Sequence, residues 1–268
     1  MNTDGLKALA VADSGSRVDI TLNRPDRRNS LDFDAWDELD SVMAGVEQRD
    51  DVRVVTLTGA GPAFCAGVDF AAIGASLEVE RGSYPAFIRR WVNIVDRFER
   101  VAQPTVVGIN GPVIGAGLEL ALACDIRIAS DQAVFAMPQM QMGIIPDVGG
   151  TSRLSRATGE AFAKDMILTS RIVDAEEALR AGIVSRVVPQ NQLAGELEGI
   201  ASAVAALPWP SAYFATVAIN VGPSLDPRRA ADIEAMADQV MLREDDVWTR
   251  ISAFMAAKGL RGVEKPGG

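Results

Sequence analysis

Short strand-like segments alternate with helix-like segments up to about residue 190, and this alternation constrains the fold more than any other feature. The strand-like segments are rich in β-branched residues and bounded by turn signals, and they cover 6–12, 17–23, 53–59, 105–109, 127–130 and 133–137,. The segments 32–50 and 84–103 are amphipathic, and the first places on one helical face Phe33, Trp36, Leu39, Met43 and Val46,. The pattern predicts an α/β fold.

The end of the chain differs in kind from this first part. A helix over 174–182, ended by Gly182, leads into a last strand-like segment, 183–188,. All the later segments resemble helices separated by proline-bearing breaks, and they cover 191–206, 210–220, 227–243 and 246–258,. We therefore predict an α/β core over residues 1–190 and a helical C-terminal region over residues 191–268.

The chain has no histidine, which removes several classes of chemistry. A Ser-His-Asp or Cys-His triad, a histidine general base and a histidine-based zinc site are all excluded, and we expect no metal. The two cysteines, Cys65 and Cys124, form no CxxC and are expected to be buried reduced thiols,. Acid–base chemistry in such a chain falls mainly to carboxylates.

Charge and hydropathy limit the partners. Lys and Arg total 26 against 36 Asp and Glu, so the net charge is −10, which disfavours binding to nucleic acid or to an anionic membrane,. The N-terminal residues lack the features of a signal peptide, and no apolar run approaches the roughly 18 residues that span a bilayer,. We expect a soluble, cytoplasmic protein.

Two glycine-bearing turns, 61–70 and 108–125, each follow a strand and lead into helix-like sequence. The first N–H groups of a helix lack internal acceptors, so two such amides converging from separate turns could hold an oxyanion. Tight packing of strand against helix is the alternative explanation. The second turn carries Leu120 where a dinucleotide-binding GxGxxG would need its last glycine, so that motif is absent,.

Two acids have apolar surroundings. Glu119 lies one helical turn after Ala116, among leucine and alanine residues that would raise its pKa, or it is an ordinary first-turn acid,. Asp147 is the one charged residue of FAMPQMQMGIIPDVGG, residues 135–150. It is either a solvated turn carboxylate or an acid placed in an apolar pocket to move protons. Met137, Met140 and Met142 could line an apolar pocket or pack in the core.

In five stretches the chain resembles the enoyl-CoA hydratase/isomerase (crotonase) family: LNRPDRRNSL (22–31), FCAGVDF (64–70), INGPVIGAGLELALACDIRIAS (109–130), GIIPDVGGTSRL (143–154) and AEEALRAGIVSRVV (175–188). The resemblance implies a crotonase-like spiral of ββα units with a helical C-terminal region that builds homotrimers, often paired into hexamers. It also implies an acyl-CoA thioester as substrate, so coenzyme A arrives with the substrate and no separate cofactor is expected.

The resemblance also assigns roles by position. The backbone N–H groups of Val68 and Ala116 would form the oxyanion hole, and Asp69 would be structural. Ala66 and Phe70 would line the groove for adenine and pantetheine.

The resemblance points to further positions that could contact coenzyme A. Phe254 would complete the CoA pocket of a neighbouring subunit. Arg27, Arg28 and Lys258 are candidates for the CoA phosphates, with a solvated surface role as the alternative. Residues 76–88 are expected to cover the acyl pocket.

The chain departs from the family's hydratases at one catalytic position. Those enzymes use two glutamates; Glu119 matches the first, but Gln139 stands at the second, and an amide cannot exchange a proton at neutral pH,. Asp147 matches the catalytic aspartate of some isomerases of the family, and we therefore interpret it as a functional acid rather than as a turn residue. The sequence therefore favours an unsaturated acyl-CoA isomerase, with enoyl-CoA hydration as one alternative and a non-catalytic acyl-CoA-binding subunit as another.

Overall fold

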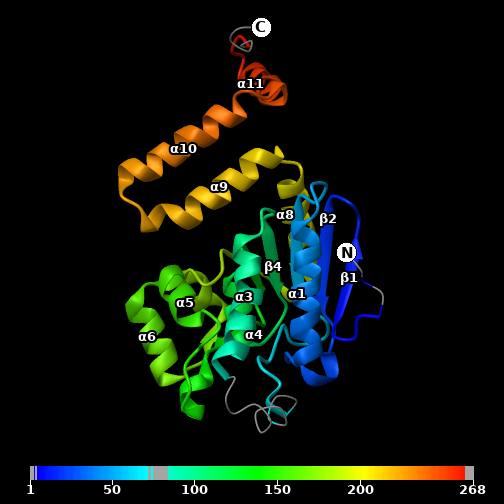
Figure 1. The fold of residues 1–268 in the computed structure, drawn as a ribbon, viewed down its shortest axis with the longest axis vertical. Coiled ribbons are helices and arrows are strands. Elements are labelled where there is room, and N and C mark those ends of the chain that lie inside the picture. Colours follow the sequence, from blue (N-terminus) through cyan, green and yellow to red (C-terminus); the bar gives the residue numbers. More distant parts are fainter. Residues whose placement is uncertain (1–2, 4, 72–73, 75–83, 263–268) are drawn as a thin grey trace. The chain divides into compact units, whose positions relative to one another are not determined.

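A computed structural model describes residues 3, 5–71, 74 and 84–262, and these form two compact units, Met1–Ala203 and Val204–Gly268 (Figure 1). Of residues 76–88, expected to cover the acyl pocket, positions 76–83 lie outside the described part of the chain. No single described helix is both long and apolar enough to cross a membrane; only segments 190–205 and 209–224 taken together reach that length and hydropathy.

A six-stranded sheet forms the centre of the first unit. In spatial order its strands are β1 (Leu9–Asp13), β2 (Arg17–Leu22), β3 (Val54–Gly59), β4 (Thr105–Ile109), β6 (Ile126–Ser130) and β9 (Arg186–Val188). β1 and β2 form the predicted antiparallel hairpin, and every later pair is parallel. β4 is buried along its whole length, as expected for a strand inside a mostly parallel sheet,.

A second, three-stranded sheet contains β5 (Val113–Ile114), β7 (Val134–Ala136) and β8 (Val173–Asp174). β7 pairs parallel with β5 and antiparallel with β8. The sequence predicted β7, but β5 and β8 are two residues long, too short to show an alternating pattern. β5 matters for the site because only Gly115 separates its last residue, Ile114, from the first residue of the next helix, Ala116.

The helices of the first unit are α1 (Phe33–Glu47), α3 (Tyr84–Arg100), α4 (Ala116–Leu122), α5 (Gly150–Thr158), α6 (Glu160–Thr169), α7 (Ala175–Ala181) and α8 (Leu193–Ala205), with 3-10 turns η1 (Pro25–Arg27), η2 (Pro138–Met142) and η3 (Gln190–Gln192). α1 begins at the cap Asp32, whose side chain accepts from the Ala35 N–H,. Its predicted apolar face is buried except at Phe33, which is partly buried, and Trp36 stacks on Trp91 of α3 with ring centroids 4.7 Å apart,. Of the helices in this unit, α5 was not predicted from the sequence.

The two units meet along the chain near the end of α8 rather than at residue 190. α8 belongs with the core because its apolar face is buried there: Leu197 is buried, and a Cβ added at Gly108 of β4 would lie 3.1 Å from its Cδ2. An amphipathic helix resembles the helices that follow it, so only this packing assigns it to the first unit.

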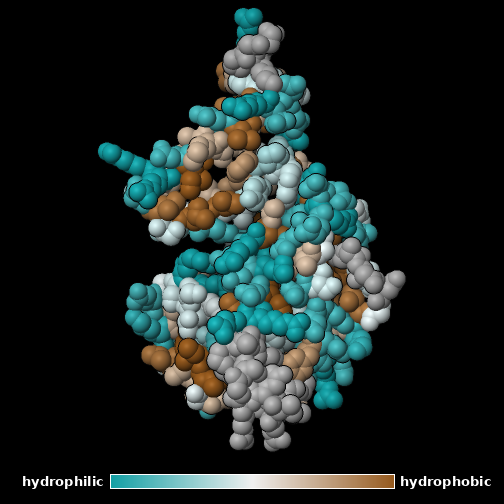
Figure 2. All heavy atoms as spheres, in the orientation of Figure 1, coloured by the Kyte–Doolittle hydropathy of each residue, from teal (hydrophilic) through white to brown (hydrophobic). Residues whose placement is uncertain are grey.

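The second unit contains α9 (Trp209–Val221), η4 (Gly222–Ser224), α10 (Pro227–Met241) and α11 (Asp245–Ala257), close to the predicted helices. Asp226 caps α10 by accepting from two backbone N–H groups, with Pro227 at the first helical position,. Apolar side chains remain exposed on these helices (Figure 2), among them Ile219, Met236 and Phe254. Such faces are typical of surfaces that bind another protein, and assembly into trimers or hexamers stays a prediction.

Candidate functional site

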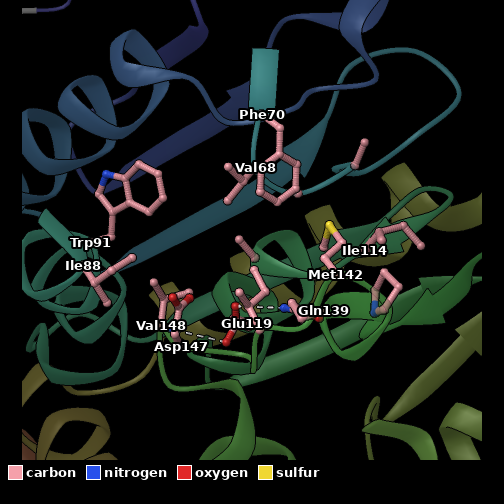
Figure 3. A pocket seen from close by; sticks show the side chains of 16 residues that line it. Val68, Phe70, Ile88, Trp91, Ile114, Glu119, Gln139, Met142, Asp147 and Val148 are labelled. Carbon is pink, nitrogen blue, oxygen red and sulfur yellow. Dashed lines mark hydrogen bonds between the residues drawn. The ribbon is translucent and has the colours of Figure 1, made fainter. Parts of the chain in front are cut away.

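A cavity of about 450 Å³ opens within the first unit, at the place where the predicted turns and acids meet (Figure 3). Its wall comes from four parts of the chain that are distant in sequence: the turn after β3, the start of α4, the stretch from η2 to α5, and α3. The lining residues are Ala66, Gly67, Val68, Phe70, Ile88, Trp91, Ile114, Gly115, Ala116, Glu119, Pro138, Gln139, Met142, Ile144, Asp147 and Val148. The wall is mainly apolar.

The first glycine-bearing turn presents the Val68 amide. Leu31 pairs with this turn on one side, donating its N–H to the Gly67 carbonyl at 2.7 Å and accepting from the Asp69 N–H at 2.9 Å. In that parallel bridge the peptide groups of Val68 itself face away from Leu31,. Within the described residues the Val68 N–H therefore has no protein acceptor, and it belongs to a residue that lines the cavity.

The second turn presents the Ala116 amide. The N–H groups of the two preceding residues are used, because Ile114 donates to Cys65 and Gly115 donates to Ala136, each at 2.9 Å. Ala116 is the first residue of α4, where an N–H has no acceptor inside the helix, and it finds none elsewhere in the described chain,. Two free amides thus come from separate turns to the wall of one cavity.

Gly67 shows how closely the two turns approach. Its φ of +89° favours glycine, and a Cβ at this position would lie 2.8 Å from the Ile114 carbonyl oxygen and 3.5 Å from the Ala116 nitrogen,. Any side chain would push the turns apart. The glycine is therefore required by the spacing of the two amides, which favours the oxyanion interpretation over tight packing alone.

Asp69 anchors the first turn from outside the cavity. Its carboxylate accepts from Arg24 Nη2 at 3.1 Å and from Ser30 Oγ at 3.3 Å. The same guanidinium pairs at 2.9 Å with Asp32, the cap of α1. These contacts fix the backbone on both sides of Val68, which is the structural role that the resemblance implies for Asp69.

Glu119 lies in the first turn of α4 with its side chain 1% exposed. Its Oε1 accepts from the Gly150 N–H at 2.8 Å and from the Val148 N–H at 3.2 Å. Its Oε2 lies 3.4 Å from Nε2 of Gln139. Each protein neighbour that bonds to this carboxylate is a donor, which suits its ionised form.

Burial opposes that ionised form. Burial is the largest cause of a pKa raised to about 7 for Glu119, and the nearby Asp147 carboxylate raises this pKa as well,. The hydrogen bonds from the Gly150 and Val148 N–H groups and the charge of Arg153 act in the opposite direction. A pKa near neutrality lets one group both accept and release a proton under physiological conditions.

The glycine pair at the start of α5, the cap Gly149 and the first residue Gly150, is explained by Glu119 and Arg153. Gly149 has a φ of +98°, and a Cβ there would lie 1.9 Å from Nη1 of Arg153,. A Cβ at Gly150 would lie 2.4 Å from Oε1 of Glu119. The two glycines thus let α5 begin directly against the buried carboxylate.

Arg153 holds this junction in place. Its buried guanidinium donates to the Val148 carbonyl at 3.0 Å and to Glu99 and Asp96 of α3 at 2.8 and 2.5 Å. The arginine links the peptide segment that bonds Glu119 to the helix that carries Trp91. A buried cation shared between two carboxylates is strongly held, since removal of one partner leaves an uncompensated charge.

Asp147 and Gln139 complete the polar part of the wall (Figure 3). Asp147 is partly buried and close enough to Glu119 to raise its pKa. Gln139, 6% exposed, stands on the other side of Glu119 in η2. The three side chains predicted to matter for chemistry therefore share one cavity with the two free amides.

The residues predicted to bind coenzyme A are more dispersed. Ala66 and Phe70 line the cavity, and Phe70 is 52% exposed at its edge. Arg27 and Arg28 are exposed and outside the lining. The Arg28 carbonyl accepts from the Ala66 N–H at 2.9 Å, so its backbone adjoins the cavity wall. The Nε atom of Arg27 lies 3.8 Å from Oδ2 of the neighbouring Asp26.

Phe254 and Lys258 belong to the second unit. Phe254 is 65% exposed on α11, and Nζ of Lys258 lies 5.9 Å from the centre of its ring, within the range of a cation–π contact,. Their participation in the CoA pocket of a neighbouring subunit stays a prediction.

Sequence reasoning missed much of the apolar wall. Ile88 and Trp91 come from the predicted helix 84–103, and their apolar spacing was visible without showing which side faced a ligand. Of the three methionines considered, Met142 lines the cavity, Met137 is fully buried in the core, and Met140 is outside the lining.

Both cysteines are buried and unlinked, as predicted. Burial raises the pKa of each thiol to about 12, so neither is a thiolate at neutral pH,. Within the described residues, no group of three or more Asp, Glu, Cys or His side chains could hold a metal ion.

Comparison with known proteins gives a consistent result. The family model described as enoyl-CoA hydratase/isomerase matches residues 14–257. A short-chain-enoyl-CoA hydratase of Clostridium acetobutylicum is 32% identical over 260 residues, covering 97% of this chain and 98% of that protein.

Solved structures agree with this match. The enoyl-CoA hydratase of Bacillus anthracis has a TM-score of 0.86 at 31% identity, covering 98% of this chain and 100% of that one. An enoyl-CoA hydratase/isomerase of Cupriavidus metallidurans has a TM-score of 0.85 at 26% identity and 96% coverage of each chain. These likenesses confirm the predicted fold class, a crotonase-like α/β spiral with a helical C-terminal region.

Proposed function

The chain belongs to the enoyl-CoA hydratase/isomerase family, and from that premise we propose that it moves the double bond of an unsaturated acyl-CoA thioester. The observation that supports this proposal most is the shared cavity: Glu119 and Asp147 line it together with two amides that have no acceptor within the described residues. At the position of a hydratase's second glutamate stands Gln139, which cannot carry a proton.

The two amides would stabilise the charge that forms on the substrate. When a proton leaves a carbon next to the unsaturated system, the electron pair delocalises onto the thioester oxygen as a dienolate. The N–H groups of Val68 and Ala116 would donate to that oxygen in an apolar cavity. Loss of one such donor typically costs about 2.7–4 kcal/mol of barrier, so this is a principal catalytic contribution.

The two acids would move the proton. Asp147 would take it from one carbon of the acyl group, and Glu119 would return one to another carbon. Glu119 suits the donor role because its pKa of about 7 keeps a large fraction protonated at neutral pH,. A proton passing from Asp147 to Glu119 would then restore the starting state.

Hydration of a trans-2-enoyl-CoA is the second candidate, and the names of the similar proteins favour it. In that reaction Glu119 would activate water, Asp147 would replace the missing glutamate, and Gln139 would orient the water. Both candidates are enzymatic, and membership of an enzyme family disfavours a purely binding role.

We also propose that the protein assembles as a trimer or a hexamer, with Phe254 and Lys258 of one subunit beside the coenzyme A of the next. The exposure of Phe254 on α11 and of Lys258 at its C-cap supports this arrangement. Analytical ultracentrifugation of the wild type and of Phe254→Ala, each with and without CoA, would test it.

Two absorbance assays separate the reactions. Gain of the conjugated enoyl absorbance from a 3-enoyl-CoA reports isomerisation, whereas its loss from crotonyl-CoA reports hydration. We expect isomerisation to dominate and to fall at least about a hundredfold in Asp147→Asn. An Asp147→Asn enzyme with full isomerase turnover would refute the proposed role of Asp147, and dominant hydration would favour the second candidate.

A further inference from the structure

The hydrogen bonds of Glu119 are divided unequally between its two oxygens. Oε1 is saturated by the backbone N–H groups of Val148 and Gly150, which stand on either side of Gly149, the cap of α5, and as main-chain groups cannot turn away as a side chain can. Oε2 has one protein neighbour within hydrogen-bond distance among the described residues, Nε2 of Gln139 at 3.4 Å. A proton that Glu119 gains must therefore reside on Oε2, where the existing neighbour is a second donor.

Gln139 has an unused acceptor for such a proton. Its Oε1 is buried and has no hydrogen-bond partner within the described residues. A buried polar atom without a partner is costly, and its presence in a functional cavity requires an explanation. Since no second bond fixes the amide, its orientation is set by Glu119 alone.

The packing also permits the amide to turn. The side chain lies beside Gly115, where an added Cβ would be 3.5 Å from Nε2, 3.7 Å from Cδ and 3.9 Å from Oε1. A half-turn about the last side-chain bond exchanges Nε2 and Oε1, which have nearly the same size, so neighbouring atoms need not move.

We propose that the Gln139 amide reverses whenever Glu119 gains or loses its proton, donating through Nε2 to the carboxylate and accepting through Oε1 from the carboxylic acid. Gln139 is then a positioning residue that holds Glu119 in one place in both states. A second glutamate at this position would instead repel an ionised Glu119.

The inference extends the proposed function, since it rests on Glu119 changing its protonation state, but it does not depend on which reaction is catalysed. The charged groups that act on Glu119 are Asp147, which raises its pKa, and Arg153, which lowers it. Neither is altered by a change at Gln139, so the effect of the amide can be measured separately.

Neutron diffraction distinguishes the two orientations, because it locates the deuterons on Nε2 and on Glu119 directly. Crystals of the free, perdeuterated enzyme at about pH 9 and about pH 5 lie on either side of the Glu119 pKa of about 7,. We expect Nε2 to face Glu119 at the higher pH, and Oε1 to face a deuterated Glu119 at the lower pH. One amide orientation at both pH values, or a Glu119 that gains no deuteron, would overturn the proposal.

A variant gives an independent measurement in solution. Gln139→Met keeps the volume and removes both the donor and the acceptor, so turnover should fall about threefold to tenfold while the pKa of Glu119 in the pH–rate profile moves by less than about half a unit. An amide fixed as a donor would stabilise only the anion, and its removal would raise that pKa by about one unit or more, contradicting the proposal. Gln132→Met, on an exposed side chain, is the matched control and should change neither quantity.

Discussion

Gly150→Ala is a test of the buried carboxylate that leaves the carboxylate itself intact. Gly150 is the first residue of α5 and has an ordinary helical backbone, so alanine meets no conformational penalty there. The added Cβ would lie 2.4 Å from Oε1 of Glu119, whereas ordinary contact begins at 3.4 Å. The carboxylate must therefore retreat by about 1 Å, the difference between these distances, or α5 must shift.

The expected loss of activity follows from that displacement. A misplacement of about 1 Å in a catalytic group can cost about a hundredfold in rate, so we expect kcat to fall by about that factor. Overpacking should lower the free energy of unfolding by about 1–3 kcal/mol. The assays are turnover of a 3-enoyl-CoA, followed by the gain of enoyl absorbance, and urea unfolding.

Two further variants show whether the contact with Glu119 causes the loss of activity. Gly199→Ala adds a methyl group to α8 in open space and should leave activity unchanged. Glu119→Asp shortens the carboxylate by one methylene, so the double variant should recover part of the stability that Gly150→Ala loses, giving a non-additive cycle. If Gly150→Ala kept turnover within about threefold of wild type, the reasoning that this contact fixes a catalytic group would be wrong.

Four other predictions follow from the site. Gly67→Ala should reduce kcat by about a hundredfold or more, because it would separate the Val68 and Ala116 amides that we propose as the oxyanion hole,. Gly15→Ala, at a similar positive φ but in open surroundings, should leave kcat unchanged, and steady-state kinetics of both variants checks this. Asp147→Asn should lower the pKa of Glu119, since a neighbouring negative charge is removed; the pH–rate profile checks this,. Folding raises the pKa of Glu119 to about 7, so the stability that this residue contributes is complete below about pH 4.5 and is lost as the pH rises through about 7,. The free energy of unfolding of Glu119→Gln should therefore rise by about 3 kcal/mol relative to that of the wild type between pH 4 and pH 8, which urea unfolding measures. Gln139→Glu should raise the pKa of Glu119 further and increase the ratio of hydration to isomerisation, measured with crotonyl-CoA and a 3-enoyl-CoA.

The fold could be predicted where elements are long and strongly patterned. The hairpin, the buried parallel strands and the C-terminal helices lie close to their predicted positions, because β-branched runs and apolar helical faces record burial directly,. α5 could not be predicted: Gly149 caps it and Gly150 is its first residue, and both favour a turn, while the Gly150 N–H bonds to the distant Glu119. Such a tertiary contact leaves no local pattern.

The same distinction applies to the site. Glu119 and Asp147 could be singled out because an acid among apolar residues is unusual wherever it lies in the fold. Arg153 could not, since its role depends on Glu99 and Asp96 from a helix more than fifty residues earlier in the chain. Trp91 lies in the segment 84–103, which was recognisable as amphipathic, but only the assembled cavity shows that this residue lines it.

The proposed function requires that this cavity move a proton between carbons of an acyl-CoA through a dienolate. Proton NMR of a 3-enoyl-CoA incubated with the enzyme in deuterated water tests it most directly. We expect a conjugated 2-enoyl-CoA carrying deuterium on carbon, formed faster than any hydroxyacyl product. Formation of a 3-hydroxyacyl-CoA alone from crotonyl-CoA, with the 3-enoyl-CoA unchanged and free of deuterium, would contradict it.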